Sequence, residues 1–345
     1  MKPQDINSTV IARLAGVSRS TVSRVINNYP NVPPETREKV QRVIDEYNYS
    51  PIASGRMLAG KNTETIGLFM IDEGQVSEDL LSSLMIVSVI EHASARGYHV
   101  LTDIVRPGPS ERVRAVKHMF AQRRIDAGLF IGAANDEPFV EELIAAGHWV
   151  GLVDHDVPGR EEPNRVVVNY DNLDGMRQAI RHLAGLGHRR IGFIAGDPHR
   201  LSGRTKREAF ETAMREAGLE IERAWVLPGS FSEKGGYTAM TEFLRSGRPL
   251  PTAIVAANDS IAFGAIAALR EAGRRVPEDV SFVGFDDHAL SARFQPALTT
   301  ARVDVRRMLG YAVDGLIDRV DGRGDTPRRT EVGYELVVRQ SCRRA

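Results

Sequence analysis

Arginine and hydroxyl side chains gather on one short segment near the start of the chain, from Ser18 to Arg24. Val22, Val25 and Ile26 recur there at helical spacing, so a helix would bury them on one face and expose arginines and hydroxyls on the other. An arginine fork can bond guanine O6 and N7 together, and hydroxyls can bond phosphates. The candidate DNA contacts of this segment are Ser18, Arg19, Ser20, Thr21, Ser23, Arg24 and Asn27. The pattern predicts a helix that reads a major groove.

The residues around that segment predict a helix-turn-helix. Gly16 permits a tight turn, and Ser18 can cap the following helix by accepting hydrogen bonds from its free N–H groups. A further helix is expected from Pro33 and Pro34 onward, with acidic residues in its first turn. Basic residues outnumber acidic ones over residues 1–62, although the formal net charge of the whole chain is zero. An ordinary pair of polar helices is the alternative, and these surroundings favour contact with DNA phosphates.

From Thr65 onward the sequence changes character. Apolar runs that predict strands alternate with amphipathic runs that predict helices, which is typical of βαβ units and parallel sheets. The pattern begins again near residue 165, so we expect two Rossmann-like lobes of one architecture. The expected strands cover residues 65–71, 99–104, 127–131, 149–153, 166–169, 190–195, 253–256 and 281–285. The expected helices cover residues 79–96, 110–123, 137–146, 173–186, 206–217 and 260–272.

The predicted organisation has three parts. Residues 1–49 would form a small all-α helix-turn-helix domain, residues 50–63 a hinge helix and linker, and residues 64–345 an α/β domain of two lobes. The chain would cross back between the lobes near residues 295–330. In open parallel sheets, ligands bind beyond the carboxyl ends of the strands, so a cleft between the lobes is the expected ligand site.

The bulk properties of the chain point to the cytoplasm. The first residues lack the apolar core of a secretory signal, and no later stretch stays apolar long enough to cross a bilayer, so no membrane partner is expected. Cys342 is the only cysteine, which leaves no disulfide and no thiolate metal site. We expect Cys342 to lie in an exposed tail.

Several patterns could indicate catalysis or cofactor binding, but each lacks the residues or the neighbouring elements that such a site requires. Residues 55–62 nearly spell a phosphate-binding loop, but the run ends in Asn62 in place of Ser or Thr, and no strand precedes it. Asp154, His155 and Asp156, with His148 nearby, lack the helical spacing or the thiolates of a common metal site. No Gly-x-Ser-x-Gly nucleophile elbow occurs. We therefore expect no enzyme, no metal and no cofactor.

Several segments together resemble the lactose-repressor (LacI/GalR) family of bacterial regulators over almost the whole chain. They are LAGVSRSTVSRVINN at 14–28, PPETREKV at 33–40, and residues 49–61, 187–196, 256–265, 276–287 and 296–300. The resemblance implies a homodimeric repressor that binds a pseudo-palindromic double-stranded operator. It also implies that Leu58, on a hinge helix, enters the minor groove as an apolar wedge. Gly55 stands where a better helix former is usual, which predicts a looser hinge away from DNA.

The same resemblance implies a sugar-like effector held between the lobes. The ligand contacts that it implies are Asp72, Asp154, Arg204, Lys206, Phe231, Asn258 and Asp286. Carboxylates and an amide suit hydroxyl-rich ligands, and an aromatic face covers apolar sugar C–H surface. The family's usual effector-binding arginine falls on Lys206, so Arg204 or Lys206 takes its part, or the effector is unusual. Asp72 is the candidate where an Asn-Pro-Phe-Phe-like segment is replaced.

Two other classes of protein share parts of this pattern. A solute-binding protein for transport would need a signal peptide and would not need residues 1–60, and a sugar-processing enzyme would need a catalytic carboxylate pair that we cannot place. The expected helix at 79–96 carries Leu80, Leu81, Leu84, Met85 and Val87, which predicts either a dimer surface or simply core. No leucine heptad follows residue 330, so no added tetramer tail is expected.

Overall fold

The computed structural model describes residues 6–26, 29–47, 49, 62–71, 80–106, 108, 110–135, 137–156, 159–324 and 326–345. Backbone contacts divide the chain into two compact units, Met1–Thr63 and Glu64–Ala345. Among the predicted site residues, Asn27, Leu58 and Asp72 lie outside the described residues.

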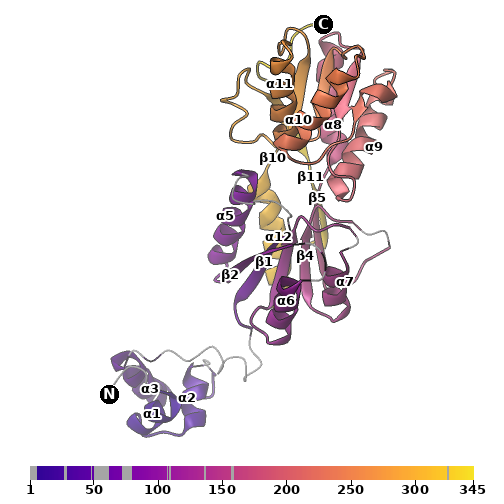
Figure 1. Ribbon diagram of the computed structural model, residues 1–345. Helices are drawn as coiled ribbons and strands as arrows, with labels where there is room; N and C mark the ends of the chain where they lie inside the picture. The colour runs from indigo at the N-terminus through magenta and orange to yellow at the C-terminus, as the bar shows by residue number, and fades with distance from the viewer. Residues whose placement is uncertain are drawn as a thin grey trace. The chain divides into compact units, whose positions relative to one another are not determined.

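The described part of the first unit is built on helices α1 (Ser8–Leu14), α2 (Arg19–Ile26) and α3 (Pro34–Glu46) (Figure 1). Ile11, Val22 and Val40 are fully buried between them. Gly16 turns the chain between α1 and α2 with a φ of +63°. Ser18 Oγ accepts a hydrogen bond from the N–H of Thr21 and so caps α2. The predicted helix-turn-helix is confirmed.

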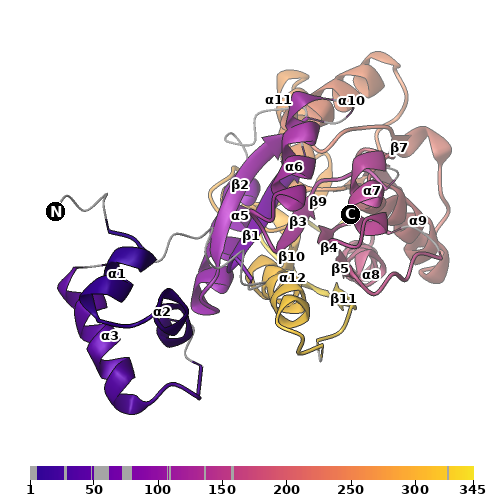
Figure 2. The ribbon, with the colours of Figure 1, turned by 90° about the horizontal axis from the view of Figure 1, so that it is seen from below.

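Lobe 1 of the second unit contains a parallel sheet whose order, in the described residues, is β11-β5-β4-β3-β1-β2. Its strands are β1 (Thr65–Ile71), β2 (His99–Val105), β3 (Ala127–Ile131), β4 (Trp149–Val153), β5 (Arg165–Tyr170) and β11 (Arg329–Val332). Helices α6 (Glu111–Ala121) and α7 (Pro138–Ala145) cover one face, around Phe69 and Phe130. Helices α5 (Leu80–Ala95) and α12 (Val305–Val320) pack together, and α12 covers the other face (Figures 1 and 2).

Lobe 2 contains a sheet of order β12-β10-β9-β8-β6-β7, parallel except for β12, which runs antiparallel to β10. Its strands are β6 (Ile191–Ile194), β7 (Val226–Leu227), β8 (Ala253–Ala256), β9 (Ser281–Phe285), β10 (Thr299–Val303) and β12 (Tyr334–Val337). Its helices are α8 (Asn172–Gly185), α9 (Leu201–Glu216), α10 (Glu233–Arg245) and α11 (Asp259–Glu271). The expected fold of two α/β lobes with parallel sheets is confirmed.

The described chain passes between the lobes at three places, namely Asp171, Asp304 and Gly333. Asp171 ends the passage from β5 and caps α8 by accepting from the N–H of Asp174. Asp304 does the same at the start of α12, where it accepts from the N–H of Arg307. At two of the three passages, an aspartate thus satisfies free N–H groups of the helix that the chain enters.

The expected secondary structure was incomplete in two respects. The helix expected at 206–217 begins at Leu201, which brings Ser202 into its first turn. The helices α10 and α12 and the strands β7, β10, β11 and β12 had no counterpart in the sequence prediction. Gly203 does not interrupt α9, since it packs against the Asp197 carbonyl, where a Cβ would stand 1.8 Å from that oxygen.

Cys342 does not lie in an exposed tail. Its Sγ donates to the Phe282 carbonyl at 3.1 Å, and it packs against the larger apolar core. The reason is that the segment after β12 runs beside β9, where Ser341 bonds Phe282 through both its carbonyl and its hydroxyl. Burial raises the pKa of the Cys342 thiol to about 11, which disfavours the nucleophilic thiolate at neutral pH. Within the described residues, no helix is long and apolar enough to span a bilayer.

Candidate functional site: a cleft between two lobes

A cleft of about 950 Å³ lies between the two lobes. Lobe 1 lines it where β1, β3, β4 and β5 end, and lobe 2 lines it where α9, α10 and α11 begin and where β9 ends. Parallel strands end and the following helices begin at one edge of a sheet, so both lobes turn polar groups toward this cleft. Its polar and aromatic lining includes Asp154, Tyr170, Arg200, Ser202, Lys206, Phe231, Asn258, Asp259 and Asp286.

The structure brings most of the predicted ligand contacts together in this lining. They are Asp154, Lys206, Phe231, Asn258 and Asp286. Arg204 is exposed on α9 and is not among the described residues of the lining. Positions two apart on a helix point about 200° away from each other, so Lys206 and Arg204 face opposite sides.

Asp154 joins the two lobes. It stands directly after β4 with a φ of +59°, a conformation uncommon outside glycine. Its Oδ2 accepts a hydrogen bond of 2.6 Å from the hydroxyl of Ser202, in the first turn of α9 on the opposite lobe. Its Oδ1 is buried and has no hydrogen-bond partner among the described residues. Burial raises the pKa of the Asp154 carboxyl, while the Ser202 hydroxyl acts in the opposite direction.

Lys206 supplies a buried cation at the base of the cleft. The residue is 3% exposed, and its Nζ donates to the Ala257 carbonyl at 2.8 Å. Asp286 Oδ1 lies 3.8 Å from the same nitrogen, and the Phe285 ring centre lies 4.6 Å from it. A buried ammonium needs such partners, because burial without them would favour its neutral form.

Asn258 and Asp259 stand where α11 begins. Asn258 Oδ1 caps the helix by accepting from the N–H of Ile261 at 2.9 Å, which leaves its amide NH₂ group for the cleft. Asp259 accepts from the hydroxyls of Ser291 and Thr300, each at 2.6 Å. Burial and the nearby Asp286 charge raise the pKa of Asp259 to about 8. Asp259 therefore holds the surrounding loop, and Asn258 is the group free to meet a ligand.

Two glycines leave the space that large side chains of the cleft occupy. A Cβ on Gly196 would lie 2.2 Å from the Phe231 ring, so only glycine lets that ring settle there. A Cβ on Gly132, whose φ is +86°, would lie 2.3 Å from the Arg200 guanidinium. Arg200 Cζ is 5.9 Å from the Phe231 ring centre, within the range of a cation–π contact.

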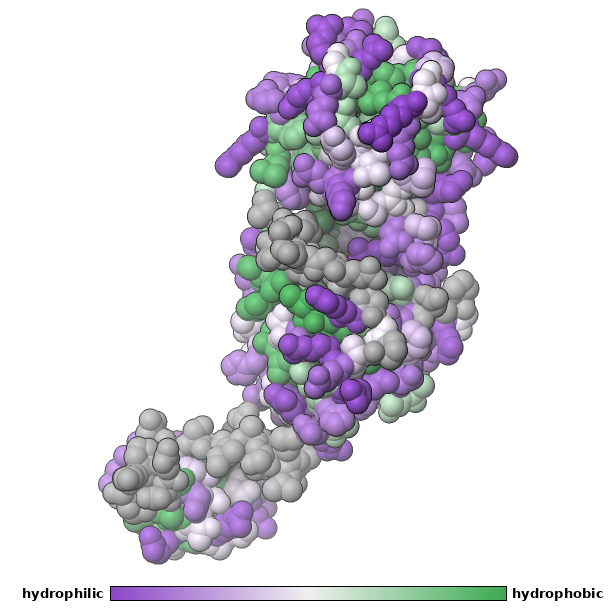
Figure 3. All heavy atoms as spheres, in the orientation of Figure 1, coloured by the Kyte–Doolittle hydropathy of each residue, from purple (hydrophilic) through white to green (hydrophobic). Residues whose placement is uncertain are grey.

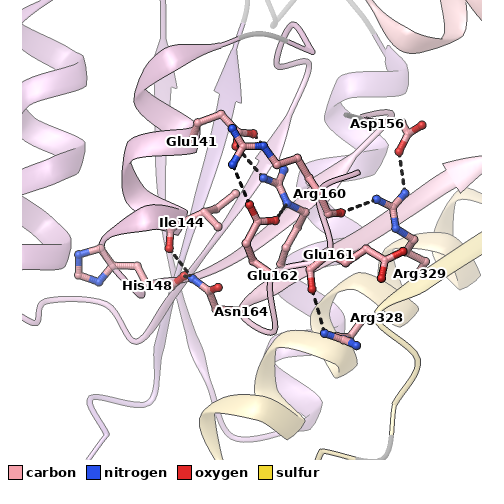
Figure 4. A network of polar contacts seen from close by, with 11 residues as sticks. Glu141, Ile144, His148, Asp156, Arg160, Glu161, Glu162, Asn164, Arg328 and Arg329 are labelled. Atoms are coloured by element: carbon pink, nitrogen blue, oxygen red, sulfur yellow. Dashed lines mark hydrogen bonds and ion pairs between the residues drawn. The ribbon is translucent and has the colours of Figure 1, made fainter. Parts of the chain in front are cut away.

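An ion-pair network supports the segment that follows Asp154 (Figure 4). Arg165, whose side chain is 2% exposed, donates to both carboxylate oxygens of Glu141, at 3.0 and 2.7 Å, and to Glu162 at 2.9 Å. Arg329 on β11 bonds Asp156 at 2.7 Å. The ring of His155 is buried beside this network, and burial with the Arg165 charge lowers its pKa to about 4. These residues fix the backbone around the cleft and do not line the cleft itself.

The predicted DNA-reading residues lie on one short helix and its cap. Ser18, Arg19, Ser20, Ser23 and Arg24 are exposed, and Thr21 is half-buried. Arg19 Nε donates to Ser8 Oγ on α1 at 3.1 Å, which orients its guanidinium. Ser18 Oγ lies 2.7 Å from the Ser20 hydroxyl and 2.8 Å from the Thr21 hydroxyl. The described surface of α2 thus offers arginine forks and hydroxyls, as base edges and phosphates require.

The cleft residues absent from the sequence prediction include Tyr170, Arg200, Ser202 and Asp259. Tyr170 ends β5, so its place after an expected strand was a usable signal. Arg200 and Ser202 stand at the start of α9, and the late helix start expected from the sequence hid them. Asp259 follows Asn258 directly, and its burial could not be deduced from the sequence.

Comparison with known families gives two matches. Residues 10–51 match the family described as bacterial regulatory proteins, lacI family. Residues 180–342 match a periplasmic binding protein-like domain.

Two curated relatives match nearly the whole chain. The HTH-type transcriptional repressor PurR of Haemophilus influenzae (strain PittEE) is 35% identical over 336 residues, 96% of this chain and 97% of the relative. The HTH-type transcriptional regulator CelR of Thermobifida fusca is 34% identical over 335 residues, with the same shares covered.

Two solved structures are similar over almost their full length. A complex of the transcriptional regulator CelR with cellobiose has a TM-score of 0.74 and 31% identity, covering 97% of this chain and 99% of that one. A lac repressor dimer bound to operator and the anti-inducer ONPF has a TM-score of 0.80 and 27% identity, covering 98% and 99%.

Proposed function

The chain belongs to the LacI family of bacterial regulatory proteins, and on that premise we propose that it is a cytoplasmic transcriptional repressor whose operator affinity is changed by a sugar-like effector bound in the cleft. The observation that carries the proposal is the pairing, in one chain, of the arginine- and hydroxyl-bearing helix α2 with a polar cleft between two lobes. Full-length relatives that are repressors support the same reading.

The DNA-reading part of the proposal assigns α2 to the major groove. Arg19 and Arg24 would bond guanine edges, while Ser18, Ser20, Thr21 and Ser23 would bond phosphates or base edges. Asn27 and Leu58 keep their proposed roles at bases and in the minor groove, and both lie outside the described residues.

The effector part assigns Asp154, Asn258 and Asp286 to ligand hydroxyls and Phe231 to an apolar sugar face. Lys206 would take the place of the family's usual arginine, because its ammonium already faces Asp286 at the base of the cleft. A ligand that binds both lobes changes their relative closure, and a coupling of about 1–3 kcal/mol is enough to switch operator occupancy.

The proposed assembly is a homodimer that joins through α5. Leu84, Val87 and Ile90 recur along this helix and are between 36% and 48% exposed, and Ile104 on the adjacent β2 is 47% exposed. Figure 3 shows apolar side chains gathered on the side of lobe 1 where α5 and β2 lie. Leu81 and Met85 pack toward the core, so the stripe predicted from the sequence divides between core and surface. A two-fold dimer would present two α2 helices to a pseudo-palindromic site.

We propose that the cleft binds its ligand without converting it. Two of its described carboxylates are occupied in holding the protein, since Asp259 accepts three hydrogen bonds and Asp154 accepts one from Ser202. Bound sugar recovered unchanged from the protein after prolonged incubation would support this.

The experiment that tests the DNA-reading claim measures binding of the full-length protein to its own upstream DNA and to a shuffled duplex at fixed salt. Arg19→Ala should reduce the preference for upstream DNA by about tenfold or more, because one bidentate base contact contributes roughly 1–3 kcal/mol of discrimination. Arg42→Ala is the control, since it removes an exposed arginine of α3 from the same unit. Equal wild-type affinity for the two duplexes would contradict the proposal.

A further inference from the structure

Arg200 brings a guanidinium into the cleft from lobe 2 and reaches toward lobe 1. A Cβ on Gly132 of lobe 1 would stand 2.3 Å from its terminal nitrogen. Within the described parts of the chain, the ion pairs around the cleft join Lys206 to Asp286 and Arg339 to Asp287, and none includes Arg200. The Arg200 charge acts on Asp154, but that carboxyl bonds Ser202 instead.

The place of Arg200 in the fold makes its positive charge unusual. Arg200 is the N-cap of α9, a helix of 16 residues, and its side chain makes no capping hydrogen bond. Helix N-termini carry partial positive charge and favour anions, whereas cations are favoured at C-termini. A guanidinium here adds one positive charge to another, and an anion in the cleft would relieve both.

The other described charges of the lining have partners or reach solvent. Lys206 bonds the Ala257 carbonyl and faces Asp286, and Asp259 accepts three hydrogen bonds. Lys234 and Glu233 adjoin each other at the start of α10, and both are exposed. Arg200 is half-buried and makes no ion pair or side-chain hydrogen bond among the described residues, so its fork of N–H donors stays available to a ligand beside its longer-range attraction to Asp154.

The Asp154 carboxylate is a second group in the cleft that could bind a ligand atom. Asp154 Oδ1 is buried without a hydrogen-bond partner among the described residues. A buried acceptor of this kind is costly unless a donor reaches it, and a ligand hydroxyl would supply one. A ligand with both a hydroxyl and an acidic group would satisfy Asp154 and Arg200 together.

We infer that the effector is an acidic sugar derivative, bearing a carboxylate or a phosphate that Arg200 binds through its planar fork, and a hydroxyl that meets Asp154. The inference rests on the proposed function and deepens it by naming the ligand class. Oxyanions fit the guanidinium fork through two parallel N–H···O bonds, and such charge-assisted bonds are stronger than those to neutral acceptors.

Calorimetry of the full-length protein with matched probes tests this inference. D-Glucose, D-galactose and D-mannose are each compared with their uronate and their 6-phosphate at one pH and at two salt concentrations. At least one acidic member should bind about tenfold tighter than its neutral parent, with a preference that falls at high salt. Arg200→Gln should abolish that preference, and Arg200→Lys should retain part of it. Arg204→Gln, which removes an exposed arginine from the same helix, should leave it intact.

The inference is overturned if no acidic member binds at millimolar concentration, if neutral parents bind as tightly as their acids, or if Arg200→Gln keeps the preference while remaining folded by circular dichroism. Operator binding is measured on the same samples. Specific binding that a neutral sugar shifts would overturn the acidic class and leave the proposed function standing. Absence of specific operator binding would defeat the proposed function itself, whatever the calorimetry gives.

Discussion

The hydroxyl of Ser202 on lobe 2 donates to Asp154 Oδ2 on lobe 1 at 2.6 Å, and this hydrogen bond crosses the cleft. It ties the end of β4 to the first turn of α9, so both lobes contribute to one polar centre. Any ligand that competes for Asp154 or adds to this contact changes the free energy of lobe closure.

Ser202→Ala is expected to weaken effector binding by about tenfold, because a hydrogen bond to a carboxylate contributes roughly 1.5–3 kcal/mol. Operator affinity without effector should shift as well, because the lost bond joins the two lobes whose closure is proposed to set operator affinity. Titration calorimetry with the effector, beside operator binding, measures both. Ser246→Ala, which removes a hydrogen-bonded hydroxyl at the far end of α10, is the control. Unchanged effector affinity in Ser202→Ala would remove the cross-lobe bond from the account.

Val87→Glu should convert the protein to monomers at micromolar concentration. Val87 is 48% exposed on α5, and a carboxylate in the proposed dimer surface would be buried without a partner. Sedimentation velocity measures the change. Glu91→Gln, one turn away on the same helix, should leave the association state as it is in the wild type. A Val87→Glu protein that remains dimeric would place the interface elsewhere.

His155 makes stability depend on pH. Its ring is buried and its pKa is lowered to about 4, so between pH 4 and 6.5 the unfolded chain binds a proton that the folded chain does not. The contribution of His155 to the free energy of unfolding is therefore fully present above about pH 6.5, and it is lost as the pH falls toward 4. Urea unfolding at several pH values should show a smaller fall for His155→Gln than for the wild type. If the free energy of unfolding fell equally with pH in His155→Gln and in the wild type, the lowered pKa of His155 would be contradicted.

Two glycine substitutions should have opposite effects on stability. Gly203→Ala should lower the free energy of unfolding by about 1–3 kcal/mol, since its Cβ would stand 1.8 Å from a backbone oxygen. Gly185→Ala should raise it by up to about 1 kcal/mol, because this helical glycine has open space around it. Denaturant unfolding gives both values. If Gly203→Ala left the free energy of unfolding unchanged, α9 could begin without the close approach to Asp197.

The parts of the fold that periodicity could predict were those with uninterrupted local patterns. Val22, Val25 and Ile26 placed the DNA-reading helix, and apolar runs placed every strand up to β9 except the two-residue β7. The helix α10 was not predicted, and it carries Gly235 and Gly236 in its first turn, although glycine is a poor helix former. The structure gives the reason for these glycines: a Cβ on Gly236 would lie 2.1 Å from the Ile261 carbonyl, and one on Gly264 would lie 1.8 Å from that of Glu233. Close backbone contact between α10 and α11 requires glycine at these positions. This contact is long-range, so it cannot be predicted from the local sequence.

The cleft was predictable in outline and not in its electrostatics. Asp154 and Asp286 follow strands, where ligand contacts are expected. The burial of Lys206 and the unpaired charge of Arg200 depend on where α9 begins, five residues earlier than 206. The antiparallel pairing of Thr300 with Val337 is a long-range contact, so strand periodicity gave no means of finding β12.

Ligand binding in the cleft should change operator affinity, and a single titration measures this coupling. Fluorescence anisotropy of the full-length protein on its labelled upstream DNA, at fixed salt, is measured with and without a saturating panel of neutral and acidic sugars. Specific binding is expected, and one compound should shift its affinity by about fivefold or more, in line with the 1–3 kcal/mol typical of such coupling. Specific binding that no ligand shifts, although calorimetry records a ligand in the cleft, would contradict it.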